Sequence, residues 1–266
     1  MTPEQHSQAA ADLLRAEESG EQIGLLSLRH PEMEMDDAYA VQNAIYQQKL
    51  AQGHKVIGWK IGLTSKAMQY ALGIDIPDSG ILFDNMAFED RAVVPKGRFI
   101  QPRIEAEIAF VMKAPLAGEE VSRADVIAAT DYVVPSIEIL DTRILRADPQ
   151  TGRARNVLDT ISDNAANAGI VLGRQRHAVD AFDLRWVGAI TTRNGEVEET
   201  GLGAGVLNDP VESVVWLARR MAQYGQAIEA GQVILSGSFI RPVECPAGTA
   251  IHADFGPFGS VSVSFE

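Results

Sequence analysis

The sequence predicts an α+β fold, with helices at the start of the chain and a mostly β-stranded core after them. Helical periodicity occupies the first 53 residues, and from residue 55 the chain changes to short apolar runs separated by glycine-rich turns. The 266 residues are 46% hydrophobic, which is enough for a sizeable core, and they contain no internal repeat. We therefore expect an N-terminal helical segment (residues 1–54) packed on a core domain (residues 55–266).

The expected helices begin at capping residues. The first is expected over residues 2–18, because Thr2 can cap it and Pro3 suits its first position. The second spans about residues 36–53, since a glycine at position 53 favours the left-handed conformation that ends helices. Three further helices are expected from the capping residues Thr64, Ser122 and Asp209, over residues 64–73, 122–129 and 209–225.

Apolar and alternating runs predict the strands. They fall at residues 56–62, 104–111, 131–140, 169–173, 233–235, 250–254 and 260–265. Residues 187–199 are expected to form a hairpin, because Asn194-Gly195 is a preferred pair for a two-residue turn. Residues 143–158 are polar and predict a long loop, while Asp78 and Asp84 are expected in turns.

Composition and charge argue against several classes of function. The chain carries 23 basic and 36 acidic residues, a net charge of −13, so a nucleic-acid partner is not expected. The single cysteine, Cys245, allows no intrachain disulfide, which fits a reducing compartment. The N-terminus shows no signal-peptide pattern, and no apolar run is long enough to span a membrane. We expect a soluble, cytoplasmic protein without a membrane partner.

Three carboxylates lie inside apolar, strand-like stretches, where acidic side chains are hard to accommodate. Glu105 and Glu107 are two residues apart, so in an extended strand they point to the same face. Glu138 lies in the strand expected at residues 131–140. A hard cation such as Mg²⁺ or Mn²⁺ would neutralise the group and leave positions open for substrate. The alternative is the solvated face of a half-exposed sheet.

Other polar residues are weaker candidates. Lys60 lies in an apolar strand and is either an edge residue that reaches solvent or a buried functional amine. Ser162, Asp163 and Asn164 belong to an unusual polar run, which predicts either a cap network or one wall of a binding site. Ser238 follows a strand and a glycine, where its hydroxyl and the backbone amides could bind a carboxylate. The five histidines show no metal-ligand spacing, and the nucleophile-elbow, phosphate-loop and dinucleotide motifs are all missing.

The chain resembles the 2-oxopent-4-enoate hydratase family, within the fumarylacetoacetate hydrolase superfamily. The matching stretches are GWKIGLTSK (residues 58–66), PRIEAE (102–107), ATDYVVP (129–135) with Glu138 following, SDNAANAG (162–169) and residues 256–265. The resemblance covers nearly the whole chain. It implies a fumarylacetoacetate hydrolase-like mixed β-sheet core with N-terminal helices, so that residues 55–266 would be the catalytic domain. It also implies a homo-oligomer, such as a pentamer or decamer.

The resemblance implies a Mg²⁺ or Mn²⁺ site made by Glu105, Glu107 and Glu138, with Lys60 and Asp78 in the active site. The implied reaction is the hydration of a 2-hydroxy-2,4-dienoate to a 4-hydroxy-2-oxo acid. We expect Lys60 near the C1 carboxylate and the enolate oxygen, and either Asp78 or a metal-bound water as the base.

Within the family, DPQTGR (residues 148–153) and DTISDN (159–164) resemble the subfamily of 2-oxohept-4-ene-1,7-dioate hydratases of homoprotocatechuate breakdown. A seven-carbon diacid needs a cation for its distal carboxylate, and Arg153, Arg155 or Arg143 could provide it. Two alternatives remain open. One is a 4-oxalocrotonate-type decarboxylase that uses the same site, and the other is a non-catalytic partner in the assembly of such an enzyme.

Overall fold

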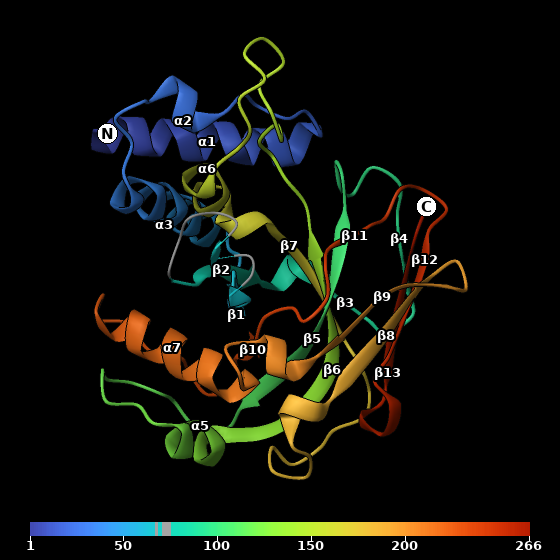
Figure 1. Cartoon of the computed structure of the whole chain (residues 1–266). Helices are drawn as coiled ribbons and strands as arrows, with labels where there is room; N and C mark the ends of the chain where they lie inside the picture. Colours follow the sequence, from blue (N-terminus) through green and yellow to red (C-terminus); the bar gives the residue numbers. More distant parts are fainter. Residues whose placement is uncertain (67–68, 71–75) are drawn as a thin grey trace.

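The computed structural model of the chain describes residues 1–66, 69–70 and 76–266. Two β-sheets form the centre, and helices lie at the top and bottom of the view in Figure 1. The helices are α1 (Pro3–Ser19), α2 (Leu26–Arg29), α3 (Met35–Ala51), α5 (Arg123–Ala129), α6 (Val157–Ser162) and α7 (Pro210–Ala222). The longer strands are β1 (Val56–Gly62), β2 (Asp78–Phe83), β5 (Arg103–Met112), β6 (Thr130–Leu140), β7 (Asn167–Leu172), β8 (Gly188–Arg193), β9 (Glu196–Leu202), β12 (Ala250–Asp254) and β13 (Ser260–Phe265). The shorter strands are β3 (Ala87–Phe88), β4 (Ala92–Val94), β10 (Val233–Leu235) and β11 (Val243–Glu244).

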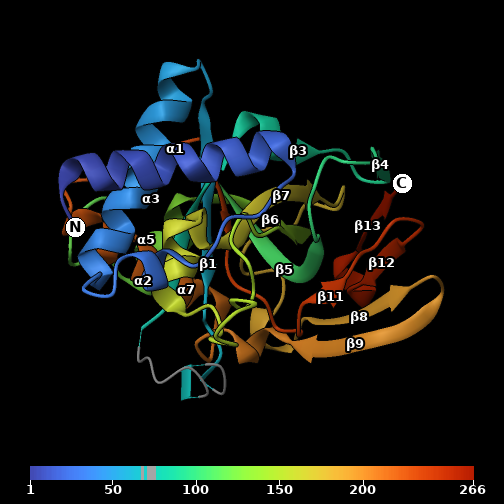
Figure 2. The same ribbon diagram turned by 90° about the horizontal axis from the view of Figure 1, so that it is seen from above.

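The larger sheet has eight strands in the order β2-β1-β10-β5-β6-β7-β3, with β11 also paired to β5. It is mixed, since β1 pairs with β10 and β3 with β7 in parallel, while β5, β6 and β7 are antiparallel neighbours. The second sheet has five strands in the order β4-β13-β12-β8-β9. Its β8–β9 hairpin turns at Asn194 and Gly195 and projects as the orange arm in Figure 2. The α+β organisation and its mixed sheet are as the sequence predicts.

The N-terminal helices share a hydrophobic cluster of their own. Thr2 caps α1 in a reciprocal arrangement with Gln5, and Gly20 ends the helix with φ of 73°. Apolar residues of α1, α2 and α3 pack together with Ile144 and Ile161 from the central part of the chain. The division of the chain at residue 54 stays a prediction, because this cluster includes residues from both sides of it.

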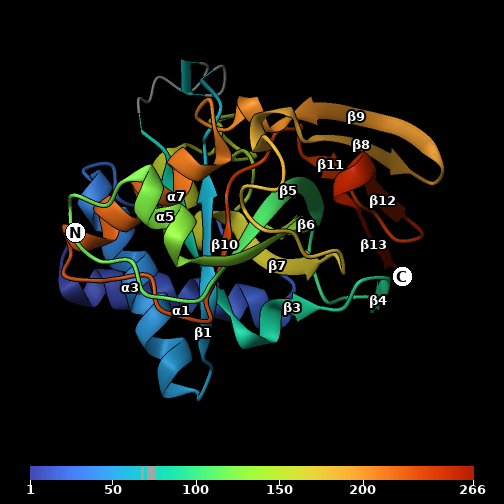
Figure 3. The ribbon, with the colours of Figure 1, turned by 90° about the horizontal axis from the view of Figure 1, so that it is seen from below.

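Helices α5 and α7 cover the core from the other end of the molecule. Their apolar residues pack with the central strands β5 and β6 in the largest hydrophobic cluster, and Figure 3 shows the two helices side by side. Helix α7 begins as expected from its sequence, with the Asp209 side chain accepting a hydrogen bond from the Val211 amide and Pro210 in the first position. None of the helices in the described part of the chain is long and apolar enough to cross a membrane.

Two elements differ from the sequence-based expectations. Asp78 was expected in a turn, but it is the first residue of β2, whose six residues are all buried against β1 and the turn before β7. The end of the loop expected at residues 143–158 is instead the start of α6, which Asn156 caps through the amides of Leu158 and Asp159. The helix end expected at Gly73 lies outside the described residues.

Asp159 holds α2 against α6. Its carboxylate is fully buried, and it accepts hydrogen bonds from the amide and the hydroxyl of Ser27 at 2.9 and 2.7 Å and from the Asn156 amide at 3.1 Å. We expect Asp159→Asn to lower the free energy of unfolding by about 1–3 kcal/mol, because the amide replaces an acceptor oxygen with a donor that faces other donors. Urea denaturation measures the change. Asp131→Asn, on an exposed aspartate, is the control, and an equal effect of the two substitutions would contradict the role given to Asp159.

Candidate active site

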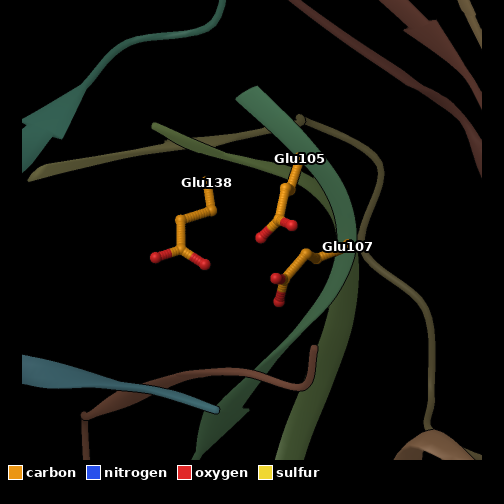
Figure 4. A group of neighbouring side chains, drawn as sticks. All are labelled: Glu105, Glu107 and Glu138. Carbon is orange, nitrogen blue, oxygen red and sulfur yellow. The ribbon is translucent and has the colours of Figure 1, made fainter. Parts of the chain in front are cut away.

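The pairing of β5 with β6 brings three carboxylates together. Glu105 and Glu107 project from the same face of β5, and Glu138 of β6 lies directly opposite Glu105 in the antiparallel register. Each residue offers an oxygen within 4.8 Å of those of the other two, and Figure 4 shows the three carboxylates converging. Glu107 and Glu138 are fully buried and Glu105 is half-buried, so this is not the solvated sheet face that the sequence left open.

Burial and mutual repulsion leave these acids short of positive charge. Burial, followed by the charge of Glu138, raises the pKa of Glu105 to about 8. The same two causes and the nearby Glu105 raise the pKa of Glu107 well above its usual value. Burial also raises the pKa of Glu138, although Lys60 opposes this effect. At neutral pH the group therefore needs protons or a cation to compensate its charge.

The oxygens have few donors to satisfy them. The Gly237 amide donates to Glu107 Oε2 at 2.8 Å, but Glu107 Oε1 and both Glu138 oxygens have no hydrogen-bond partner among the described residues. Closely spaced, buried, unpartnered carboxylate oxygens are the ligands that hard divalent cations prefer. The three residues therefore fit a hard divalent cation, and Mg²⁺ or Mn²⁺ stays the prediction.

Lys60 and Asp78 lie beside this cluster on the β1–β2 pair. Lys60 Nζ is 3.6 Å from Glu138 Oε1, which is an ion pair longer than a hydrogen bond. Both residues are at most 4% exposed. Burial alone would lower the pKa of Lys60, but Glu138, Asp78, Glu105 and Glu107 together raise it above its usual value, so the amine stays charged. Burial raises the pKa of Asp78, which Lys60 partly offsets.

Two glycines make room for these side chains. A Cβ atom on Gly62 would lie 2.2 Å from Asp78 Oδ1 and 3.0 Å from Lys60 Nζ. A Cβ atom on Gly80 would lie 3.2 Å from Lys60 Cε and 2.6 Å from the Asn164 carbonyl oxygen. Gly80 lies opposite Lys60 in the antiparallel ladder of β1 and β2, a pairing that the sequence did not indicate.

A left-handed turn follows α6 and borders the site. Asn164, Ala165 and Ala166 have φ values of 51°, 52° and 57° in succession, a conformation that costs about 1–2 kcal/mol for each residue. The Asn164 side chain holds this turn to β2, since it accepts from the Ile81 amide at 2.8 Å and donates to the Ile81 carbonyl at 2.9 Å. Ala165 and Ala166 then line the cavity next to Lys60.

The structure places part of the expected substrate-binding set inside the protein, away from the cavity. Asp163 accepts a hydrogen bond from Arg143 Nε at 2.6 Å inside the protein, so both charges are used within the fold. Ser162 and Asn164 are also buried, and neither lines the cavity. These residues therefore support the left-handed turn, and Arg143 is not free to bind a distal carboxylate. The polar residues of this run support the site, and its alanines, Ala165 and Ala166, form part of the cavity wall.

A cavity of about 390 Å³ opens above Lys60, Asp78 and Glu105. Ser238 and Arg155 line it, whereas Arg153 is exposed and lies outside it. The Arg155 side chain is half-buried and donates to the Thr142 hydroxyl, and no carboxylate of the described residues pairs with it. The sequence missed the other lining residues because they come from separate segments of the chain; they include Thr64, Thr160, Phe239, Ile240 and Arg241.

The chain is similar to characterised proteins over nearly its full length. It is 50% identical over 260 residues to the 2-oxo-hept-4-ene-1,7-dioate hydratase of Escherichia coli, covering 98% of this chain and 97% of that protein. It is 41% identical over 266 residues to a 2-keto-4-pentenoate hydratase of Paraburkholderia xenovorans (strain LB400), covering 100% and 97%. No family model matches the sequence.

Solved structures share the fold. The 4-oxalocrotonate decarboxylase from Pseudomonas putida G7, solved with magnesium and adipate, matches with a TM-score of 0.93 at 37% identity over 100% of this chain and 99% of that one. A fumarylpyruvate hydrolase from Pseudomonas aeruginosa matches with a TM-score of 0.58 at 11% identity over 78% of this chain and 88% of that one, which shows the fold alone. The chain therefore belongs to the 2-oxopent-4-enoate hydratase family, within the fumarylacetoacetate hydrolase superfamily.

Proposed function

We propose that this protein is a Mg²⁺- or Mn²⁺-dependent hydro-lyase of aromatic meta-cleavage catabolism. It adds water to a 2-hydroxy-2,4-dienoate and gives a 4-hydroxy-2-oxo acid. The observation that carries the proposal is the buried cluster of Glu105, Glu107 and Glu138 beside Lys60 and Asp78, at the base of a cavity. The 50% identity to a 2-oxo-hept-4-ene-1,7-dioate hydratase favours the seven-carbon diacid of homoprotocatechuate breakdown as substrate.

Glu105, Glu107 and Glu138 would hold the metal ion. When bound, it would supply Lewis acidity that stabilises negative charge on the C2 oxygen of the substrate. The protonated amine of Lys60 lies next to Glu138 and attracts the C1 carboxylate and the C2 oxygen to the same end of the cavity. Four carboxylates surround this single amine. An anionic substrate therefore needs the positive charges of both the metal ion and Lys60 in order to enter the cavity.

Asp78 moves the proton in this proposal. Its Oδ1 is buried and has no hydrogen-bond partner among the described residues, so it is free to face a reacting group. Burial raises its pKa towards the range in which a carboxylate can both accept and return a proton. The proton of the 2-hydroxyl leaves as C5 is protonated, which gives the 2-oxo-3-enoate. Asp78 then accepts a proton from the water whose oxygen adds at C4, and it returns this proton to C3, so the product is the 4-hydroxy-2-oxo acid.

Arg155 binds the distal carboxylate of a diacid substrate in this proposal. Among the three arginines that the sequence offered for this role, only Arg155 lines the cavity without a carboxylate partner in the described part of the chain. Asp163 and Asp159 also lie near Arg155 and partly offset its charge, while Arg143 and Arg103 are each paired with a carboxylate of their own.

The runner-up reaction is decarboxylation of a 4-oxalocrotonate-type acid, favoured by the TM-score of 0.93 to a decarboxylase. Incubation with 4-oxalocrotonate and measurement of released CO₂ separates the two.

We also propose that the protein acts as a homo-oligomer, a pentamer or decamer, in the cytoplasm. Exposed apolar side chains on and beside the β8–β9 hairpin support an interface, with Trp186 at 74%, Ile190 at 49% and Leu202 at 44% exposure.

The first test removes one metal ligand. Saturating Mg²⁺ should raise the melting temperature of the wild-type protein by roughly 5–10 °C, because an ion at about a hundred times its dissociation constant adds about 2.7 kcal/mol of stability. Glu107→Gln should lose this shift and the turnover of the dienol. Without metal the variant should be at least as stable as the wild type, since it removes one of the repelling acids. A full Mg²⁺ shift in Glu107→Gln would contradict the assigned site.

The second test concerns the proton transfer. We expect Asp78→Asn to lower kcat by at least about a hundredfold, the usual contribution of a general base, while KM changes little. Absorbance of the dienol at saturating Mg²⁺ measures both constants. Asp84→Asn, on the exposed aspartate that follows β2, should leave kcat unchanged. If Asp78→Asn kept wild-type kcat, another group would have to be the base.

The third test compares two arginines that are two residues apart. Arg155→Gln should raise KM for a seven-carbon 2-hydroxydienedioate by roughly ten- to hundredfold, the loss expected for a charge-assisted hydrogen bond. The KM for a five-carbon monoacid should change much less, because that substrate has no distal carboxylate. Arg153→Gln is the matched control and should leave both values unchanged, since Arg153 lies outside the cavity. Equal effects of Arg155→Gln on the two substrates would refute the assignment.

A further inference from the structure

A second cavity, of about 510 Å³, lies between α3, α7 and the β1–β2 pair. Figure 1 shows α3 above this pair of strands and α7 below it. Tyr39 and Tyr46 of α3, Trp59 of β1 and Tyr224 after α7 supply aromatic walls. The cavity shares no lining residue with the one above the three carboxylates. Its volume is in the range of small-molecule sites.

The two cavities lie on opposite faces of the same strands. Side chains alternate along β1 and β2, so that Lys60 and Asp78 face the carboxylates while their neighbours Trp59 and Ser79 face the second cavity. A molecule in the second cavity would therefore contact the strands that carry Lys60 and Asp78.

A cation without a counter-ion is held in this cavity. The Arg220 guanidinium lies 5.3 Å from the centroid of the Tyr39 ring and 4.8 Å from that of the Tyr224 ring. Its Nη1 donates to Gln223 Oε1 at 3.1 Å, but its Nε is buried without an acceptor, and no carboxylate of the described residues forms an ion pair with it. The two rings fix the guanidinium in place before any ligand arrives.

A second unsatisfied donor lies beside it. The Tyr39 hydroxyl is buried and makes no hydrogen bond to the described residues, although Arg220 is near enough to affect its titration. Burial, with the charge of Asp78, raises the pKa of Tyr39 to about 12, so the hydroxyl is protonated at neutral pH and can donate. A buried donor without an acceptor costs about 1–3 kcal/mol. An anionic acceptor would satisfy both donors. The exposed Asp36 at the rim of the cavity disfavours a ligand with a second negative charge.

We propose that this cavity is a second ligand site, for a small aromatic monocarboxylate. The carboxylate accepts hydrogen bonds from the Arg220 guanidinium and the Tyr39 hydroxyl, and the ring packs among Tyr46, Trp59 and Tyr224. Aromatic side chains favour a flat ring through offset or edge-to-face contacts, which a saturated ring cannot form equally well. The site is independent of the reaction proposed above, because it uses none of the residues assigned to that reaction.

The test is a calorimetric titration of the full-length protein with benzoate, benzamide and cyclohexanecarboxylate. Benzoate should bind with a 1:1 stoichiometry per chain, and the uncharged benzamide at least about tenfold more weakly, as expected when a charge-assisted hydrogen bond is lost. Cyclohexanecarboxylate should also bind more weakly than benzoate. Absence of saturable benzoate binding up to about 10 mM would overturn the proposal. The same holds if binding is absent because a second copy of the chain covers the cavity.

Variants locate the binding. Arg220→Gln should weaken benzoate binding at least about tenfold, and Tyr39→Phe, which keeps the ring, should weaken it severalfold. Arg219→Gln removes the same charge from an exposed position on α7 and should leave binding unchanged. Arg155→Gln and Glu107→Gln should also leave it unchanged, which separates this site from the active site. Wild-type affinity in Tyr39→Phe and Arg220→Gln, or weaker binding in Arg155→Gln, would show that benzoate binds elsewhere.

Discussion

The constraint on which this structure depends is the packing of four carboxylates, three of them buried and one half-buried, around one amine at the centre of a sheet. Glu105, Glu107, Glu138 and Asp78 all lie close enough to Lys60 to raise its pKa. Desolvation penalises each charge by several kcal/mol, so the arrangement persists only where the surrounding structure imposes it. The β5–β6 ladder imposes it on the three glutamates, because moving either strand by one residue would turn their side chains to the opposite face.

The neighbouring elements follow from this constraint. Glycine is needed beside Asp78 and opposite Lys60, because a Cβ atom would lie 2.2 Å from Asp78 Oδ1 at Gly62 and 2.6 Å from the Asn164 carbonyl oxygen at Gly80. The left-handed turn at residues 164–166 carries conformational strain, and it is retained by two side-chain hydrogen bonds to Ile81 and by the buried Arg143–Asp163 pair just before it. Strain of this size is tolerable because many backbone and side-chain contacts determine the same conformation. The buried polar groups after α6 thus shape the site without lining its cavity.

Local patterns in the sequence were sufficient for most elements and for the same-face placement of Glu105 and Glu107. The position of Glu138 opposite Glu105 depends on strand register, which a single strand does not encode. Asp78 was misread as a turn residue because the cation and the backbone groups that accommodate it are distant in sequence. Arg143, Arg153 and Arg155 were equivalent in the sequence, since a loop has no periodicity from which to infer direction. Only the fold separates them: one is paired, one is exposed and one lines the cavity.

Hydration and decarboxylation place the same demands on most of this site, and this explains why the shared fold alone does not decide between them. Both reactions need the 2-oxo acid head held in one orientation and negative charge stabilised on its C2 oxygen. A TM-score of 0.93 to a decarboxylase reports this shared framework. The reactions differ three to five carbons from the 2-oxo acid head. Hydration needs a water molecule and a base there, whereas decarboxylation needs the carbon–carbon bond to the departing CO₂ to break. We therefore expect the residues that discriminate between the reactions to lie along the cavity wall, which Asp78 and Arg155 both line.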